Sequence, residues 1–312
     1  MMSDKSVESF FFHCKYEKNL SEKTLKAYKT DITQFRNFIT EKGVSKVEDT
    51  DKYLLRGYIK NIYKFKPKTI KRKIATLKAL FNYLEFEDKI IVNPFRKIKV
   101  NIRTGQQLPS TIKLSNIKKL FRYLYNKKEF YESNSPDREF TIFTISRDIA
   151  ILEILFGTGL RVSEAANIKI ENIDLTHGWI KINGKGNKDR TIPVCDNEIK
   201  QAIRKYLSCI KLKEGYLFKN RLNNKISEQS IRFMIRKYAK EAKIQQHITP
   251  HMFRHTIATL LLERGVDIMY IQSLLGHSSI NTTQIYIQIN EKAKKRIINK
   301  KHPRRDFQMI PE

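Results

Sequence analysis

The segment 145–165, ISRDIAILEILFGTGLRVSEA, decides how the second half of the chain folds. Its first part, Ile145 to Phe156, is almost continuously apolar and is long enough for a buried helix. Gly157-Thr158-Gly159 then supplies the residue type that ends helices, because glycine accepts a left-handed backbone conformation. We predict a buried helix that stops at these glycines, followed by a short helix that contains Arg161 and Glu164.

Downstream of this segment, the pattern predicts a small sheet and then more helices. Residues Trp179 to Asn183 alternate between polar and apolar side chains, as a strand does. Gly184-Lys185-Gly186-Asn187 is typical of a hairpin turn, and Arg190 to Val194 would form the return strand. The remaining apolar patterns predict helices at 197–209, 228–243, 250–263 and 267–275, and one after Thr282.

Upstream, residues 1 to 100 show helical periodicity alone. Phe10 to Phe12 would lie on the buried face of a first helix. Ser21 and Pro67 are residue types that begin helices, and Gly43 is one that ends them. Three further helices are predicted here, at 21–41, at 51–63 and from Pro67 onwards. This part of the chain therefore predicts a helical domain.

The middle of the chain predicts a boundary between two domains. The segment from Asn93 to Ser115 contains proline and glycine and has little apolar periodicity, which is typical of a linker. Ser115 would cap the next helix, and residues 126–140 are polar enough to predict a surface loop. We expect a mainly α fold with a small β-sheet (α+β). Its parts would be a helical domain (1–100), a linker (101–113), a mixed domain (114–300) and a basic tail (301–312).

The charge of the chain indicates a polyanionic partner. Its 61 lysines and arginines outnumber 32 acidic residues, which gives a formal net charge of +29. Such a chain attracts nucleic acid. An ordinary enzyme from an A/T-rich genome, in which lysine is inflated, is the alternative. The helix that begins at Pro67 favours DNA, because its polar face gathers cations that suit phosphates: Lys68, Lys71, Arg72 and Lys78.

Several other classes of protein are disfavoured. The chain has 3 cysteines, Cys14, Cys195 and Cys209, and their spacing fits neither a disulfide framework nor a zinc site. They predict reduced thiols in the cytoplasm. No apolar run is long enough to cross a membrane. We find no acidic cluster of magnesium-binding character and no nucleotide-binding glycine pattern, so we expect neither a metal nor a cofactor.

Separate pieces of sequence carry candidate chemistry. Each is ambiguous by itself, because an arginine after a glycine turn usually caps a helix and a lysine in a hairpin is usually solvated. A tyrosine within a helix usually packs in a core. The pieces are Arg161 in GTGLRVSE (157–164), Lys185 in the glycine-flanked turn, HMFRH (251–255), LGHS (275–278) and Tyr286.

Together these pieces resemble the tyrosine recombinase (phage integrase) family. Residues 157–164 look like the family's first arginine box, and 251–255 look like its His-x-x-Arg box. Residues 274–286 look like the box that ends in the nucleophile, and Lys185 lies in the hairpin where the family has its lysine. The order and spacing match over residues 114–290, with no active-site position substituted.

The remaining parts of the chain fit the same resemblance less specifically. The helical N-terminal half resembles the family's core DNA-binding, SAM-like domain. Because no arm-binding domain precedes residue 1, the Xer-like, short-chain branch is the nearest match. The loop predicted at 126–140 is longer than a minimal member of the family needs.

The resemblance implies metal-free cleavage through a covalent 3′-phosphotyrosyl intermediate, with Tyr286 as the nucleophile. His251 would accept the phenol proton, because the pKa of an imidazole lies near working pH. Lys185 would protonate the leaving 5′-oxygen. The phosphotyrosyl bond conserves the energy of the broken phosphodiester, so rejoining needs no ATP.

The other site residues would stabilise the phosphate. The forked guanidinium groups of Arg161 and Arg254 suit its non-bridging oxygens. His277 would donate a further hydrogen bond. Glu164 would hold an arginine or a histidine in place, and His255 would pack behind the site or support it.

The resemblance also implies the partners. They are double-stranded DNA with a specific core site, gripped by the two domains as a clamp, and further subunits. A homotetramer on two DNA sites would form, with a hetero-partner recombinase as a variant and a Holliday junction as the intermediate. The helix beyond Tyr286 would pack on a neighbouring subunit, with packing in its own subunit as the alternative. Chromosome dimer resolution, mobile-element integration or excision, and inversion all stay open.

Competing classes make different predictions. A type IB topoisomerase uses the same residue types, but the His277 box and the two-domain layout favour a recombinase. A catalytically silent DNA-binding protein would have lost at least one catalytic position, and all are present. An RNA-binding module is weaker still, because no aromatic stacking motif is found.

Overall fold

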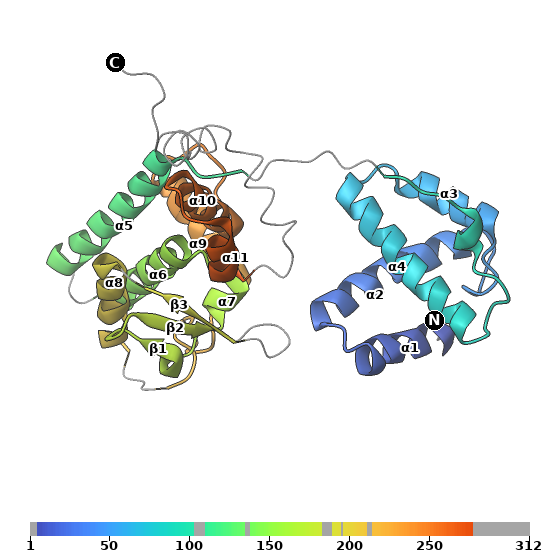
Figure 1. Ribbon diagram of the computed structural model, residues 1–312, viewed down its shortest axis with the longest axis horizontal. Helices are drawn as coiled ribbons and strands as arrows, with labels where there is room; N and C mark the ends of the chain where they lie inside the picture. The colour runs from blue at the N-terminus through green and yellow to red at the C-terminus, as the bar shows by residue number, and fades with distance from the viewer. Residues whose placement is uncertain are drawn as a thin grey trace, which may run out of the picture. The chain divides into compact units, whose positions relative to one another are not determined.

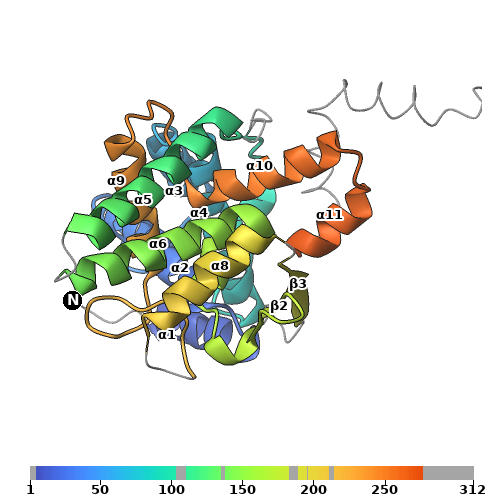
Figure 2. The same cartoon turned by 90° about the vertical axis from the view of Figure 1, so that its left-hand side faces the viewer.

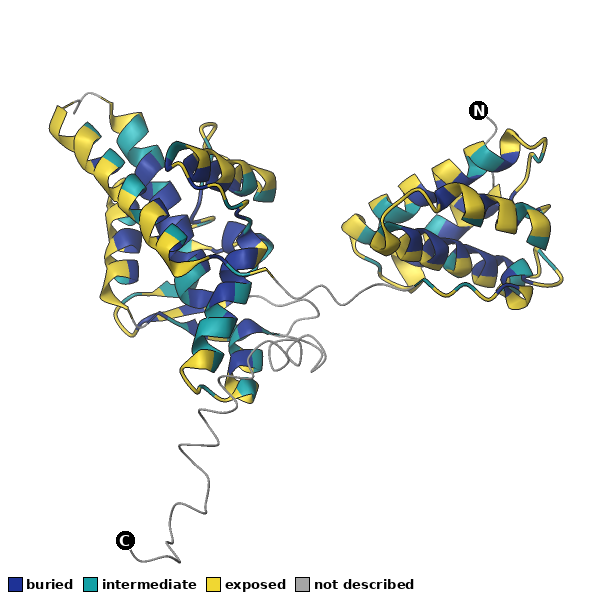
Figure 3. Cartoon of the chain, turned by 90° about the horizontal axis from the view of Figure 1, so that it is seen from above, coloured by how far each residue is buried: buried dark blue, intermediate teal, exposed yellow. Residues whose placement is uncertain are grey.

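The protein is described here by a computed structural model, which covers residues 5–102, 110–134, 138–182, 189–194, 196–210 and 214–276. The chain forms two compact units, Met1–Gln107 and Leu108–Glu312 (Figure 1). Each unit has its own hydrophobic core, and Figure 3 shows the buried residues gathered inside each. The fold is mainly helical with one small sheet, as the sequence predicts. No helix in these ranges is long and apolar enough to cross a membrane.

The N-terminal unit is helical, and the predicted helix boundaries are confirmed. The side chains of Ser21 and Asp51 each accept a backbone hydrogen bond from the first turn of their helix. Pro67 opens its helix, and Gly43 takes a left-handed φ of +80°. The elements are α1 (Lys5–Phe12), the π-helical η1 (His13–Glu17), α2 (Glu22–Thr40), α3 (Lys52–Ile62), α4 (Pro67–Phe86) and the 3-10 helix η2 (Pro94–Lys97).

Two predictions at the edges of this unit are wrong. Phe10 is 1% exposed but Phe12 is 60% exposed, because successive residues point in different directions around a helix. The proline-containing segment from Asn93 was interpreted as the start of a linker, although the expected helical domain runs to residue 100. The N-terminal core instead includes the buried side chains of Phe95 and Ile98, so the chain leaves this unit later than its proline content indicates.

The C-terminal unit is built around α6 (Glu139–Thr158), whose residues from Ile145 to Leu155 are almost all buried. Helices α5, α8 and α10 pack against it (Figure 2). The other elements, in chain order, are α5 (Leu114–Asn134), α7 (Val162–Ala166), the 3-10 helix η3 (Ile170–Asn172), β1 (Ile173–Asp174), β2 (Trp179–Ile182), β3 (Arg190–Pro193), α8 (Asn197–Ser208), α9 (Glu228–Glu241), α10 (Pro250–Glu263) and α11 (Ile268–Leu275).

Helix α5 differs from the prediction at both ends. Ser115 lies inside its first turn rather than before it. The loop predicted at 126–140 is mostly helix, because α5 continues to Asn134 and α6 begins at residue 139. Lys128 is 9% exposed, and its ammonium pairs with Glu132, one turn further on, at 2.9 Å. Polar residues therefore stabilise this helix rather than end it.

The sheet is antiparallel, in the order β1-β2-β3. Ile182 pairs with Arg190 at the end of the β2–β3 hairpin, which confirms both predicted strands. The short β1 was not predicted. The expected turn at 184–187 lies outside the described residues.

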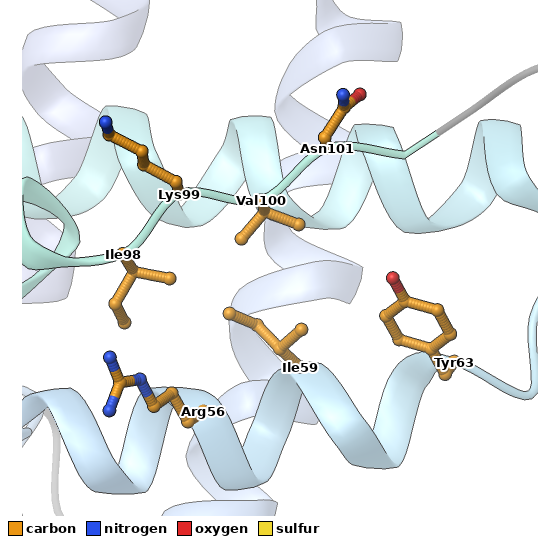
Figure 4. A pocket seen from close by; sticks show the side chains of 7 residues that line it. All are labelled: Arg56, Ile59, Tyr63, Ile98, Lys99, Val100 and Asn101. Carbon is orange, nitrogen blue, oxygen red and sulfur yellow. The ribbon is translucent and has the colours of Figure 1, made fainter.

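A hollow of about 390 Å³ opens on the N-terminal unit, between α3 and the chain that follows η2 (Figure 4). It contains none of the predicted catalytic residues. The residues that line the hollow are Arg56, Ile59, Tyr63, Ile98, Lys99, Val100 and Asn101.

Candidate active site

Arg161 precedes the short helix α7 and follows the tight turn that ends α6. In this turn, Gly159 has a left-handed φ of +64°. A Cβ atom on Gly159 would lie 2.7 Å from Leu275 Cδ2 and 2.8 Å from Ile257 Cγ2. Glycine is therefore required both by the backbone conformation and by the space. The turn lets α10 and α11 pack against the end of α6, and Arg161 emerges beside this junction.

Arg254 reaches the same junction from α10. It is 4% exposed, and its guanidinium donates from Nη1 to the Gly159 carbonyl at 3.0 Å and from Nη2 to the Leu275 carbonyl at 2.6 Å. Because a buried charge needs partners, these carbonyls hold the arginine in one orientation. Arg254 thereby ties the end of α6 to the end of α11.

The two predicted arginines meet at the C-terminal end of α11. Arg161 Nη2 donates to the Gly276 carbonyl at 2.8 Å, while Arg254 binds the carbonyl of the preceding residue, Leu275. Because Leu275 and Gly276 are consecutive residues, whose Cα atoms lie about 3.8 Å apart, the two guanidinium groups bind neighbouring carbonyls. The carbonyls at the end of a helix carry partial negative charge, so they attract both cations. The fold thus concentrates two guanidinium groups beside one turn, although their sequence positions differ by almost a hundred residues.

Glu164 contacts both the backbone and the side chain of Arg161. Its Oε2 atom accepts the Arg161 backbone N–H at 2.8 Å, and its Oε1 atom accepts from the Arg161 guanidinium at 2.8 Å. Burial raises the pKa of Glu164, but hydrogen bonds from Arg190 and Arg161 outweigh it and leave the pKa below its ordinary value. The carboxylate is therefore ionised near neutral pH and stabilises arginine.

Arg190 is a contact residue that the sequence reasoning missed. It lies at the start of β3 and donates to both carboxylate oxygens of Glu164, at 3.1 and 3.0 Å. A signal was present in the sequence, because Arg190 shares a strand face with Ile192, which is fully buried. An arginine on the inner face of a strand needs a buried anion as its partner.

His251 lies in the first turn of α10, where its side chain is partly exposed to solvent and partly covered by the protein. Partial burial, then the positive charges of Arg232, Arg254 and Arg161, lower its pKa below the ordinary 6.5. An imidazole in this state is neutral at neutral pH and can accept a proton. Burial, then the charges of His251 and Arg254, lowers the pKa of His255 to about 4. His255 thus stays uncharged beside the cationic site.

Lys185, His277 and Tyr286 lie outside the described residues, so their predicted roles stay predictions. For Lys185 and His277, the described chain gives the position of nearby residues in the sequence. Lys185 belongs to the connection between paired residues Ile182 and Arg190. His277 directly follows Gly276, whose carbonyl Arg161 binds.

The cationic face predicted for DNA contact lies on α4, where all of its residues are exposed: Lys68, Lys71, Arg72 and Lys78. The Arg72 guanidinium also pairs with Asp31, which is fully buried in the N-terminal unit. Lys73, which is buried on the same helix, pairs with Asp31 at 3.2 Å. Arg72 therefore has a structural partner in addition to its predicted role, and DNA contact by this face stays a prediction.

The structure thus brings the guanidinium groups of Arg161 and Arg254 to one junction of helices, and their positive charges also act on the His251 imidazole. Comparison with known proteins gives the class. The profile described as "Phage integrase family" matches residues 141–293, and "Phage integrase, N-terminal SAM-like domain" matches residues 7–88. The chain therefore belongs to the phage integrase family, the tyrosine recombinases, and it is an enzyme of that family.

Relatives match the chain over nearly its whole length. A tyrosine recombinase of Agathobacter rectalis is 41% identical over 305 residues, which cover 96% of this chain and 97% of the relative. A protein named tyrosine recombinase XerC, from Thermodesulfovibrio yellowstonii, is 37% identical over 308 residues. The match covers 95% of this chain and 96% of the relative. A XerH site-specific recombinase, solved in a post-cleavage complex with a palindromic difH substrate, has a TM-score of 0.72. It is 22% identical, covers 96% of this chain and 86% of that chain, and supports the fold.

Proposed function

We propose that this tyrosine recombinase cleaves double-stranded DNA at a specific core site, holds the cut strand on Tyr286 and rejoins it to a different strand. One observation carries the assignment of the active site. Arg161 and Arg254 converge on the carbonyls of Leu275 and Gly276, immediately before His277. Residues from three separate sequence boxes are thereby brought to one turn.

The cleavage step exchanges one phosphoester for another. The Tyr286 phenol oxygen forms a bond to phosphorus while the bond from phosphorus to the 5′-oxygen breaks, which leaves a 3′-phosphotyrosyl linkage. The phenol proton passes to His251, whose lowered pKa keeps the imidazole neutral. Lys185 supplies a proton to the departing 5′-oxygen. Rejoining reverses these transfers, with the 5′-hydroxyl of another strand as the nucleophile.

The cations act on the phosphate itself. As the phosphorus becomes five-coordinate, negative charge grows on its non-bridging oxygens, and Arg161 and Arg254 stabilise that charge. His277 adds a hydrogen bond to the same group. Glu164 keeps Arg161 in place, and the neutral His255 packs behind His251 on α10 without adding charge.

Assembly follows the same proposal. The two units would grip the duplex as a clamp, with the α4 face on phosphates and few base contacts to set the site. A lambda integrase tetramer bound to a Holliday junction shares the fold of this chain, at a TM-score of 0.68 and 17% identity. We propose a homotetramer on two DNA sites, with a hetero-partner recombinase as a variant, acting in the cytoplasm. Its task would be integration and excision of a mobile element, or chromosome dimer resolution.

The test begins with a DNA substrate. Random duplexes are selected for binding to the full chain, and the recovered sequence is rebuilt with a nick beside the cleavage position, so that cleavage cannot reverse. The wild type should form a covalent protein–DNA complex that survives denaturing electrophoresis. Tyr286→Phe should bind the same duplex and form none.

A matched control separates chemistry from side-chain loss. Tyr270 is an exposed tyrosine of α11, so Tyr270→Phe should form the complex at the wild-type rate. Covalent complex that persists in Tyr286→Phe would refute the assignment of the nucleophile. A wild-type protein that binds the selected duplex but never becomes attached to it would refute the proposed chemistry.

A further inference from the structure

Arg190 occupies an unusual place for a charged residue. It begins β3, opposite Ile182 of β2, and its side chain is 18% exposed. On the same face of β3, Ile192 is fully buried. Burying a guanidinium is costly unless its hydrogen bonds are satisfied. Both Nη atoms of Arg190 have partners, whereas its buried Nε atom has none among the described residues.

Among the described residues, the hydrogen-bond partners of Arg190 are Glu164 and Leu275, which also bind Arg161 and Arg254, respectively. The Nη1 and Nη2 atoms of Arg190 donate to Glu164 Oε1 at 3.1 Å and Oε2 at 3.0 Å, which is the two-pronged geometry that fixes a carboxylate in direction as well as distance. Nη2 also donates to the Leu275 carbonyl at 3.4 Å. A Cβ atom on Gly276 would lie 2.8 Å from Arg190 Cζ, so this glycine lets the backbone rest against the guanidinium.

Glu164 transmits this contact to Arg161. The same two carboxylate oxygens accept the backbone N–H and the guanidinium of Arg161, each at 2.8 Å. Without Arg190, Glu164 would neutralise Arg161 and could turn away from it. With Arg190 present, both arginines share the negative charge of Glu164. Arg161, Glu164 and Arg190 together then carry a net positive charge, which attracts a phosphate.

We propose that Arg190 is a positioning residue for strand cleavage, which acts through Glu164 on Arg161 and through Gly276 on the turn that leads to His277. Its terminal nitrogens are engaged by Glu164 and Leu275, so it acts on the phosphate indirectly. It also begins the strand that follows the connection containing Lys185. One side chain thereby ties the β2–β3 hairpin to α7 and to the end of α11. This inference rests on the proposed function.

The test measures single-turnover cleavage of the nicked duplex by the full chain at saturating protein. Arg190→Gln should slow cleavage by about 10- to 100-fold, the usual loss when a supporting contact is removed. Arg190→Lys keeps the charge but not the two-pronged contact, and should fall between that variant and the wild type. Arg204→Gln is the control, because it removes an equal charge from an exposed arginine of α8. It should cleave within about twofold of the wild type. DNA affinity should fall equally in both glutamine variants.

A double-mutant cycle separates positioning from general damage. If Arg190 acts through Arg161, Arg190→Gln should slow an Arg161→Ala enzyme by less than about twofold, because the group it positions is already gone. A loss as large as in the wild-type background would overturn the proposal. So would a folded Arg190→Lys or Arg190→Gln variant that cleaves at the wild-type rate.

Folding is checked first by thermal melting. If Arg190→Gln does not fold, Arg190→Lys decides between the outcomes, and if neither folds, Arg190 is a folding residue and the proposal is overturned. Failure of the proposed function has a different signature, because the wild type itself would then form no covalent complex.

Discussion

Replacing Glu153 by glutamine should remove part of the pH dependence of folding. Glu153 lies in α6, the central helix of the C-terminal unit, and is 7% exposed. Burial raises the pKa of Glu153 to about 7. A hydrogen bond from the Tyr125 hydroxyl, at 2.9 Å, opposes this shift, and the carboxylates of Glu198 and Asp196 add to it.

The sign follows from the raised pKa. An unfolded glutamate titrates near 4.5, so the native state is favoured while Glu153 stays protonated and loses that advantage as the pH rises through about 7. Complete ionisation of the folded group costs about 3 kcal/mol relative to the unfolded chain. Between pH 6 and pH 8, the loss from this residue alone is about 1 kcal/mol.

Urea denaturation of the full chain at both pH values measures this loss. The chain has 1 tryptophan, Trp179 in β2, so its fluorescence reports on the C-terminal unit. From pH 6 to pH 8, the wild type should lose about 1 kcal/mol more of unfolding free energy than Glu153→Gln. Glu129→Gln, at an exposed position of α5, should follow the wild type. An unchanged pH dependence in Glu153→Gln would refute this reasoning.

Other perturbations test the site and the DNA surface. Gly276→Ala places a side chain at a φ of +64° and against Arg190, so it should cost about 1–2 kcal/mol in urea denaturation and slow cleavage of the nicked duplex. Wild-type cleavage by this variant would contradict the close approach. Arg254→Ala leaves the Gly159 and Leu275 carbonyls without their partner. Single-turnover cleavage should drop by at least about 100-fold, and a smaller loss than that of the exposed Arg204→Gln would contradict a phosphate role. DNA affinity should fall steeply with salt. Each substitution that removes a phosphate contact should reduce the slope of log K against log salt concentration by about 0.9. An unchanged slope would show that the exposed α4 lysines do not contact DNA phosphates. The variants for this last test are Lys68→Gln, Lys71→Gln and Lys78→Gln.

Much of the fold could be predicted because its signals are local. Capping residues such as Ser21 and Asp51 identify helix starts, and glycines such as Gly159 identify the ends. Polar residues are poor indicators of a loop where tertiary contacts stabilise them within a helix. Lys128 looked like part of a loop, but it is nearly buried within α5. Phe95 lay in an apparent linker because a proline precedes it, yet its ring belongs to the N-terminal core.

The site shows the same division. Arg161, Glu164 and Arg254 could be proposed from the sequence, because their boxes have a recognisable order, and the structure brings them to one turn. The alternation with Ile192 indicates that Arg190 faces inward, but its partner Glu164 lies on a separate element, so the pairing itself could not be predicted. Local patterns contain no record of such a pairing.

The most direct test of the account is to identify the residue that carries the DNA. The covalent complex formed on the nicked duplex is digested with a protease and a nuclease, and the modified peptide is sequenced by tandem mass spectrometry. We predict a nucleotide joined through its 3′-phosphate to the oxygen of Tyr286. Attachment to another residue, or through a 5′-phosphate, would contradict it.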